Sequence, residues 1–100
     1  MLEKLQIIQQ RFDEVSDLII QPDIIADQKR YIQLNKEYKD LKKLTERADA
    51  YKALLANQEE AEAIIKEGSD AEMIEMARMQ LEEAKSGIPI LEEEIKYLLI

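Results

Sequence analysis

The stretch MIEMARMQLEEAKSGIPILEEEIKYL at residues 73–98 decides the fold, because its apolar and small side chains recur at alternating spacings of three and four. The series comprises Ile74, Ala77, Leu81, Ala84, Ile88, Leu91, Ile95 and Leu98. An α-helix has about 3.6 residues per turn, so a spacing that averages about 3.5 keeps one face against a partner helix. A strand would alternate with a period of two. Residues 70–99 are therefore predicted to form one helix of a packed pair.

Two further helices are expected upstream of this stretch. Leu5, Ile8, Phe12, Val15 and Ile19 follow the same spacing and predict a helix over residues 2–20. Proline at position 22 ends it, because proline disfavours helical geometry in the preceding residue and donates no backbone hydrogen bond. A second helix is predicted over residues 28–67, with these residues on its packed face: Tyr31, Leu34, Tyr38, Leu41, Thr45, Ala48 and, less strictly, Tyr51, Leu55, Ala61 and Ile65.

The connections between the helices carry recognisable end signals. Asp27 is a candidate N-cap for the second helix, and Ile24 and Ile25 before it are expected to form a short buried connector. Gly68 suits the left-handed position after a helix end. Ser69 then begins a capping box with Glu72, so the last two helices should fold back antiparallel.

A proline lies inside the third predicted helix, in the sequence Gly87-Ile88-Pro89. A proline within a helix costs about 3 kcal/mol and usually kinks it. The heptad pattern nevertheless continues across this point. We expect a kinked but continuous helix, with a short break as the alternative.

Together these elements predict an all-α fold: an elongated, coiled-coil-like antiparallel hairpin with a shorter N-terminal helix packed on its base. The whole chain, residues 1–100, is expected to form a single helical domain. The base, near residues 28–48 and 85–100, should be a three-helix bundle whose seams hold the large side chains of Phe12, Tyr31 and Tyr38, with Tyr97 close by. The far end, residues 52–84, should be a bare two-helix hairpin, because the first helix is too short to cover it. Small or flexible residues on its packed face suit a close approach of the two helices.

Composition argues against several kinds of site. The chain has neither cysteine nor histidine, so it lacks thiolate metal ligands, disulfides and the commonest general base. A reducing cytoplasm is the default location, and no segment is apolar enough to span a membrane. No enzyme activity, catalytic residue, metal or cofactor is expected.

The net charge of −8 is unevenly distributed along the chain. Residues 29–56 hold eight Lys or Arg against four acids.

The basic residues of the second helix are the best candidate for a binding surface. The heptad register places five of them on one outward strip: Lys29, Lys36, Lys39, Lys43 and Arg47. They could contact phosphates with salt-dependent affinity. The alternative is a solvated face with helical ion pairs, such as Lys36 with Asp40 and Lys43 with Glu46. The strip holds no interleaved aromatic residue to stack on a base, which favours the alternative.

The hairpin tip is acidic and rich in methionine. Its carboxylates come from Glu59, Glu60, Glu62, Glu67, Asp70, Glu72 and Glu75. They suit solubility, although a basic protein or a metal could also meet them. Met73, Met76 and Met79 could form an adaptable binding surface. Helical spacing favours seam packing for Met73 and Met76, whereas Met79 falls off the seam and could contact a partner.

Several pieces of the sequence resemble the N-terminal helical region of bacterial class I peptide chain release factors, of the type that reads UAA and UAG. They are the stretch from Ile24 to Tyr31, then Leu34, Lys36-Glu37-Tyr38, Leu41, Asp70-Ala71-Glu72-Met73, Met76-Ala77, Leu81-Glu82-Glu83-Ala84 and Leu98-Leu99. The resemblance covers essentially the whole chain and implies a fragment of a longer multidomain protein. The family's Gly-Gly-Gln loop and Pro-x-Thr motif are absent, so it implies neither peptide release nor codon reading by this part.

The resemblance also implies partners. The corresponding domain of the family docks at the stalk base of the large ribosomal subunit, near ribosomal protein L11 and its ribosomal RNA. The GTPase that recycles these factors is a further candidate partner. The isolated chain is expected to be a monomer or a weak dimer. The rival interpretation is a generic coiled-coil scaffold or oligomerisation module, whose exposed seams pair between chains.

Overall fold

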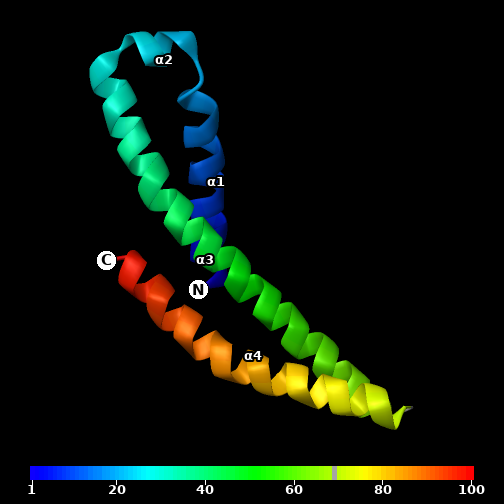
Figure 1. Ribbon diagram of the computed structural model, residues 1–100. Coiled ribbons are helices and arrows are strands. Elements are labelled where there is room, and N and C mark those ends of the chain that lie inside the picture. The colour runs from blue at the N-terminus through cyan, green and yellow to red at the C-terminus, as the bar shows by residue number, and fades with distance from the viewer. Residues whose placement is uncertain (69) are drawn as a thin grey trace. The chain divides into compact units, whose positions relative to one another are not determined.

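The computed structural model describes residues 1–68 and 70–100, and within them it contains helices and no strand (Figure 1). The helices are α1 (Leu2–Leu18), α2 (Pro22–Ala26), α3 (Gln28–Glu67) and α4 (Ala71–Leu98). The predicted all-α class is thus confirmed. By contacts the chain divides into two compact units, Met1–Glu46 and Arg47–Ile100, and α3 is continuous through the boundary.

In the first unit, α1 runs antiparallel to the beginning of α3, and the short helix α2 turns the corner between them (Figure 1). The rings of Phe12 and Tyr38 stack with centroids 5.2 Å apart, as large seam residues should. Proline occupies the first turn of α2, where a missing N–H costs nothing. Ile24 is buried, but Ile25 is exposed, so the expected buried connector is wrong for Ile25. One turn of helix presents only one of two adjacent side chains inward.

Asp27 caps α3, as the sequence predicts. Its carboxylate Oδ1 accepts a hydrogen bond from the backbone N–H of Arg30 at 3.3 Å. The backbone carbonyl of Asp27 accepts from Tyr31 at 2.9 Å and begins the helical ladder. The side-chain bond thereby satisfies one of the donors that a helix start leaves unpaired, the N–H of Arg30.

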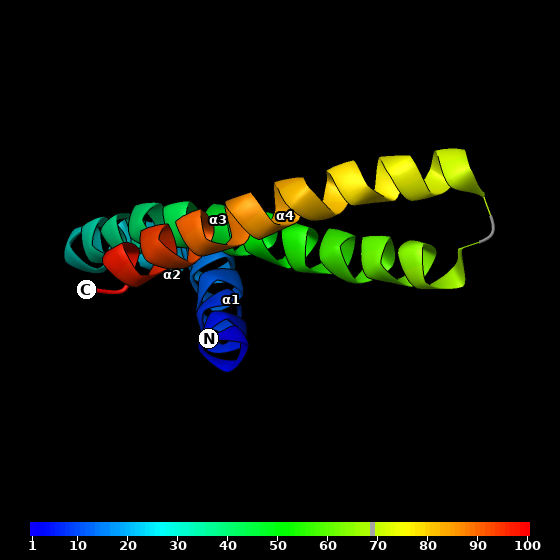
Figure 2. The ribbon, with the colours of Figure 1, turned by 90° about the horizontal axis from the view of Figure 1, so that it is seen from below.

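In the second unit, the remainder of α3 and α4 lie side by side as an antiparallel hairpin (Figure 2). Its buried positions fall where the three-four spacing predicts them: Ala48, Tyr51, Ala61, Ala77, Ala84 and Ile95. Four of these six are alanines, which allow two helix backbones to approach closely. Tyr97, which was expected only close to the packed residues of the base, is 78% exposed.

The turn between α3 and α4 uses one glycine and one aspartate. Gly68 has a φ of 67°, the left-handed geometry expected for it, and its N–H bonds to the carbonyl of Ile64 at 3.2 Å. The N-cap of α4 is Asp70, whose side chain accepts from the backbone N–H of Glu72 at 2.9 Å. The sequence predicts Ser69 as this cap. Ser69 lies outside the described residues, and the cap in the structure is Asp70.

α4 continues through Pro89 without interruption, so the alternative of a break is wrong. Gly87, two residues earlier, explains part of this unusual sequence. A Cβ atom at this position would lie 2.7 Å from Cδ1 of Leu54 on α3, so the absent side chain makes room for the leucine. The glycine is thus a packing feature of the hairpin, where the sequence suggested only a weak point in the helix.

Candidate nucleic-acid interface

The basic side chains predicted to form a strip on α3 are all exposed. They comprise Lys29, Lys36, Lys39, Lys43 and Arg47. The first four belong to the first unit, where the opposite side of α3 carries the packed residues Leu34, Tyr38 and Leu41. This separation follows from the helical period, because the lysines and the seam fall on opposite faces.

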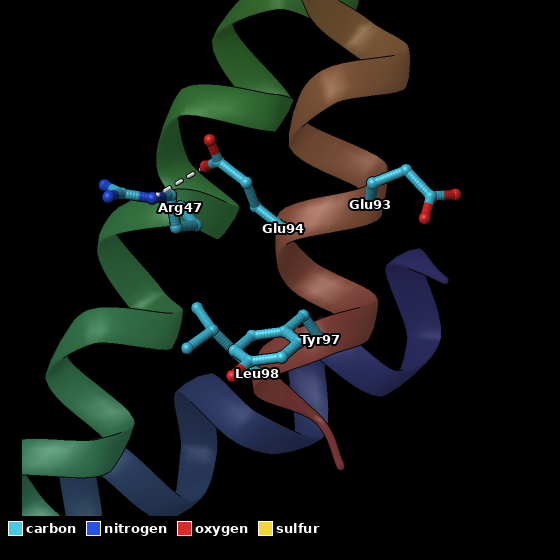
Figure 3. Close-up of a pocket in the computed structure, with 5 residues that line it drawn as sticks. All are labelled: Arg47, Glu93, Glu94, Tyr97 and Leu98. Atoms are coloured by element: carbon cyan, nitrogen blue, oxygen red, sulfur yellow. Dashed lines mark ion pairs between the residues drawn. The ribbon is translucent and has the colours of Figure 1, made fainter.

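Arg47 differs from the four lysines because it pairs within the hairpin. Its Nε lies 2.8 Å from Oε2 of Glu94 on α4, and Figure 3 shows Glu93 directed away from this contact. Arg47 therefore helps to hold α3 to α4 in the second unit. The candidate interface consequently reduces to Lys29, Lys36, Lys39 and Lys43, called the basic stripe below.

The expected intrahelical partners of the basic stripe do not form. Among residues 1–68 and 70–100, the ion pairs are Arg11 with Glu14 and with Glu37, Arg47 with Glu94, and Lys96 with Glu93. Neither the pair Lys36–Asp40 nor the pair Lys43–Glu46 is among them. The lysine ammonium groups of the stripe are therefore exposed and not neutralised by a close carboxylate in this part of the chain, which suits phosphate contact.

A shallow groove of about 410 Å³ lies beside the stripe and contains residues that the sequence did not single out. It is lined by Tyr31, Ile32, Asn35, Lys36 and Lys39. The amide Nδ2 of Asn35 donates to the carbonyl of Tyr31 at 2.9 Å and fixes one wall. Two of the stripe lysines thus share a groove with an aromatic residue, which weakens the sequence argument against base contact. The sequence feature that could have indicated this groove is Ile32, a large apolar residue outside the predicted seam, which is exposed in the structure.

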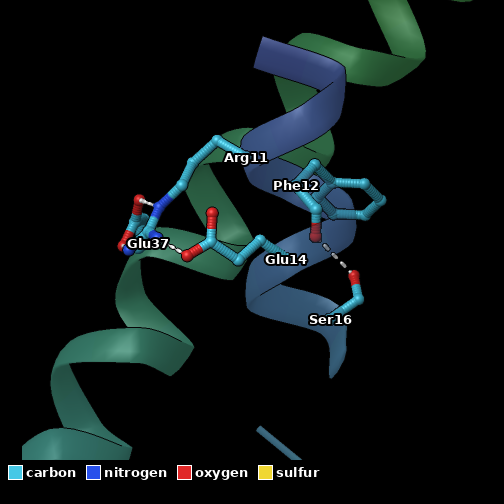
Figure 4. Close-up of polar contacts among 5 residues, drawn as sticks. All are labelled: Arg11, Phe12, Glu14, Ser16 and Glu37. Atoms are coloured by element: carbon cyan, nitrogen blue, oxygen red, sulfur yellow. Dashed lines mark hydrogen bonds and ion pairs between the residues drawn. The ribbon is translucent and has the colours of Figure 1, made fainter. Parts of the chain in front are cut away.

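A forked ion pair fixes α1 against α3 in the first unit (Figure 4). The Nε–H of Arg11 donates to Oε2 of Glu37 at 2.6 Å, and Nη2 donates to Oε1 at 2.8 Å. Nη1 donates to Glu14 at 3.0 Å within α1. The contact lowers the pKa of Glu37, chiefly through the hydrogen bonds from Arg11 and against a smaller opposing effect of burial. The same hydrogen bonds raise the pKa of Arg11, which stays charged at all ordinary pH values.

We expect this pair to make stability depend on pH in a defined window. The folded pKa of Glu37 lies below its ordinary value of 4.5, so the unfolded chain binds more protons between the two values. The stabilisation is complete above the ordinary value and is lost as pH falls through the folded pKa. Because both side chains are partly exposed, we expect Glu37→Gln to cost about 1 kcal/mol at neutral pH.

The measurement is urea unfolding of the wild type and of Glu37→Gln at a series of acidic pH values. The difference between the two unfolding free energies should shrink toward zero at low pH. Glu14→Gln is the control, because it removes an equal charge but only one, more exposed contact to Arg11. A difference for Glu37→Gln that stays constant with pH would contradict the assignment.

Residues 1–68 and 70–100 contain no group of three or more His, Cys, Asp or Glu side chains placed to hold a metal ion. Over the same ranges, no helix combines the length and the apolar character needed to cross a bilayer.

The protein is thus of an all-helical class, with a cationic face on α3 in the first unit and an antiparallel helical hairpin in the second. The chain belongs to the PCRF domain family, which matches residues 8–100. It is 69% identical over its full 100 residues to "Peptide chain release factor 1" of Flavobacterium psychrophilum, of which it covers 28%. It is 63% identical over 100 residues to the protein of the same name from Flavobacterium johnsoniae, again 28% of that protein.

A more distant relative shows the same coverage. "Peptide chain release factor 1" of Bacteroides fragilis is 52% identical over 99 residues, which are 99% of this chain and 27% of the relative. The chain thus spans about 28% of the length of the curated relatives that it matches. No solved structure matches it significantly.

Proposed function

We propose that this chain acts in translation termination, as a helical domain of a peptide chain release factor that works on the ribosome in the cytoplasm. The single observation that carries the proposal is the 69% identity to a named release factor along all 100 residues. Relatives that are 52% identical bear the same name, so the similarity is not restricted to one genus.

The role of this domain is to position the factor, without codon-reading or peptide-release chemistry of its own. A hairpin that presents one rigid helical face suits that role. The sequence also lacks both the Gly-Gly-Gln loop and the Pro-x-Thr motif that the resemblance associates with those activities. The proposed docking site is the stalk base of the large ribosomal subunit, formed by ribosomal protein L11 and its ribosomal RNA.

The surface that would meet the RNA is the basic stripe. Its four lysines are exposed, and Lys36 and Lys39 border the groove that contains Tyr31. Each lysine that neutralises a phosphate releases counterions, so affinity should fall steeply with salt. Arg47 contributes to the hairpin through Glu94 and is a weaker candidate for RNA contact than its charge suggests. The recycling GTPase is a further proposed partner, for which the structure offers no specific surface.

The test is the affinity of the chain for a stalk-base complex of L11 and its RNA, measured by fluorescence anisotropy over a range of salt concentrations. We expect saturable binding that weakens with salt. In the variant Lys36→Gln/Lys39→Gln, the slope of log affinity against log salt should become shallower by about two, one for each lost phosphate contact.

The matched control is Lys42→Gln/Lys52→Gln, which removes the same charge from α3 at exposed positions outside the stripe. Its salt slope should equal that of the wild type. Equal changes of the salt slope in the two double variants would contradict the assignment of RNA contact to the basic stripe. A folded chain that self-associates and does not bind the complex would favour the second candidate, a coiled-coil scaffold or oligomerisation module.

A further inference from the structure

A second groove lies in the hairpin unit, close to the turn between α3 and α4. Its volume is about 370 Å³, and it is lined by Glu60, Ile64, Met73, Met76, Ala77 and Gln80. We call it the methionine groove. Met73 is 50% exposed and Met76 is 68% exposed, so the expectation that both pack in the seam is wrong. The seam position on this part of α4 is the buried Ala77.

The groove has the character of an adaptable apolar binding surface. Methionine is unbranched, flexible and polarisable, so it can reshape itself around another apolar side chain. Exposed large apolar side chains that gather around a groove are uncommon in proteins that stay monomeric and often mark a place of contact. Ala77 also lines the groove, and its small side chain leaves room for an incoming one.

The charge around the groove is strongly negative. Residues 57–84 carry nine carboxylates and only two cations, Lys66 and Arg78. The helical period turns these two cations away from the faces that carry Ile64 and Met76. Glu60 lines the groove itself, and no carboxylate of this segment takes part in an ion pair among the described residues.

This combination selects the chemistry of the occupant. An apolar groove within a negative field attracts an apolar surface bordered by positive charge. An amphipathic helix with a basic polar face meets both conditions, because it can place apolar side chains at helical spacing into a groove and Lys or Arg at its edges. A second copy of this chain fits poorly, since two such acidic segments would repel one another.

We propose that the methionine groove binds an amphipathic helical segment with a basic polar face. The apolar side chains of that segment contact Met73, Met76 and Ile64, and its cations face Glu60 and the neighbouring carboxylates. This proposal stands on the hairpin unit alone. It does not depend on the basic stripe or on the proposed function.

The test uses a model peptide with leucine at i, i+3, i+4 and i+7 and lysine at the other positions. It is titrated into the chain with methyl-labelled methionine and followed by NMR at physiological salt. The chain has four methionines, so each methyl signal reports a separate place. We expect saturable shifts of the signals of Met73 and Met76. The signal of Met1, in the other unit, should not move.

Met76 and Met79 provide a matched pair of variants. Both are 68% exposed on α4, but only Met76 lines the groove. Met76→Lys should weaken peptide binding at least about tenfold, because it replaces an apolar anchor by a like charge. Met79→Lys makes the same change of charge and should weaken binding by less than about threefold, since only long-range attraction is lost.

Three outcomes would overturn the proposal. If Met76→Lys and Met79→Lys weakened peptide binding equally, the peptide would be attracted to an acidic protein in general and would not bind in the groove. Comparable binding of a peptide with glutamate in place of lysine would remove the role of the negative field. Self-association of the free chain that Met76→Lys abolishes would show that the occupant is a second copy.

Discussion

Replacement of Tyr51 by alanine is expected to lower the free energy of unfolding by about 3–5 kcal/mol, the loss typical of a buried aromatic residue. Tyr51 is 6% exposed and is the one aromatic side chain of the hairpin unit that the structure buries within the described residues. Ala48, about one turn before it on the packed face of α3, is buried and too small to fill the cavity.

Tyr51 also makes a polar contact across the hairpin. Its hydroxyl donates to Oε2 of Glu92 on α4 at 3.1 Å. Burial is the main reason why the pKa of the phenol is raised, and the hydrogen bond to a carboxylate adds to the shift. The phenol therefore stays protonated and able to donate throughout the neutral range.

Tyr51→Phe separates the two contributions. It keeps the ring and removes one hydrogen bond, so we expect it to cost only about 1 kcal/mol. The measurement for both variants is urea unfolding at neutral pH, followed by far-ultraviolet circular dichroism. Similar losses for Tyr51→Phe and Tyr51→Ala would contradict the packing argument and assign the effect to the hydroxyl.

The positions that the sequence predicted well are those that the helical period alone determines. Ala77, Ala84 and Ile95 are buried because their spacing keeps them on one face of α4, whatever the partner is. Gly68 adopts the left-handed geometry because only glycine does so without strain. The exposure of the basic stripe follows from the same period, since its lysines oppose the seam.

The sequence predicts least well the large side chains near the edge of the seam. Helical spacing favours Met73 and Met76 as seam residues, yet both are exposed, and the buried position on this part of α4 is Ala77. Tyr97 is large, but its heptad position faces outward, and it is 78% exposed. In a two-helix hairpin only a narrow stripe is covered, so a shift of one residue is enough to expose a side chain.

Features that depend on contacts between two segments could not be predicted from the sequence. The pairing of Arg47 with Glu94 requires the register of α4 against α3, which no local pattern contains. The groove beside the basic stripe depends on the side-chain conformations of Tyr31, Ile32 and Asn35 across successive turns. The methionine groove likewise needs Ile64 of α3 to meet Met73 and Met76 of α4. Candidate residues could be found in sequence, but not the surfaces they form.

Pro89→Ala is expected to stabilise the chain by about 2–3 kcal/mol, the second large effect of a single substitution. Pro89 is exposed inside α4 and donates no hydrogen bond to the carbonyl of Lys85 one turn before it. Alanine supplies that donor, removes the clash of the ring with the preceding turn and has the best helix propensity. The measurement is again urea unfolding of the variant beside the wild type.

Gly87→Ala is the matched control, because it introduces the same residue two positions earlier in the same helix. Its propensity gain of about 1 kcal/mol is opposed by the new Cβ, which would lie 2.7 Å from Cδ1 of Leu54. We expect no net gain from it in the wild type. The gain should reappear when Leu54 is also replaced by alanine, relative to Leu54→Ala alone.

If Pro89→Ala and Gly87→Ala stabilised the wild type equally, helix propensity alone would govern this segment, and the close packing of Leu54 on Gly87 would be without energetic consequence. If Pro89→Ala gave no gain, the local helix geometry that proline favours would itself be part of the fit between α4 and α3.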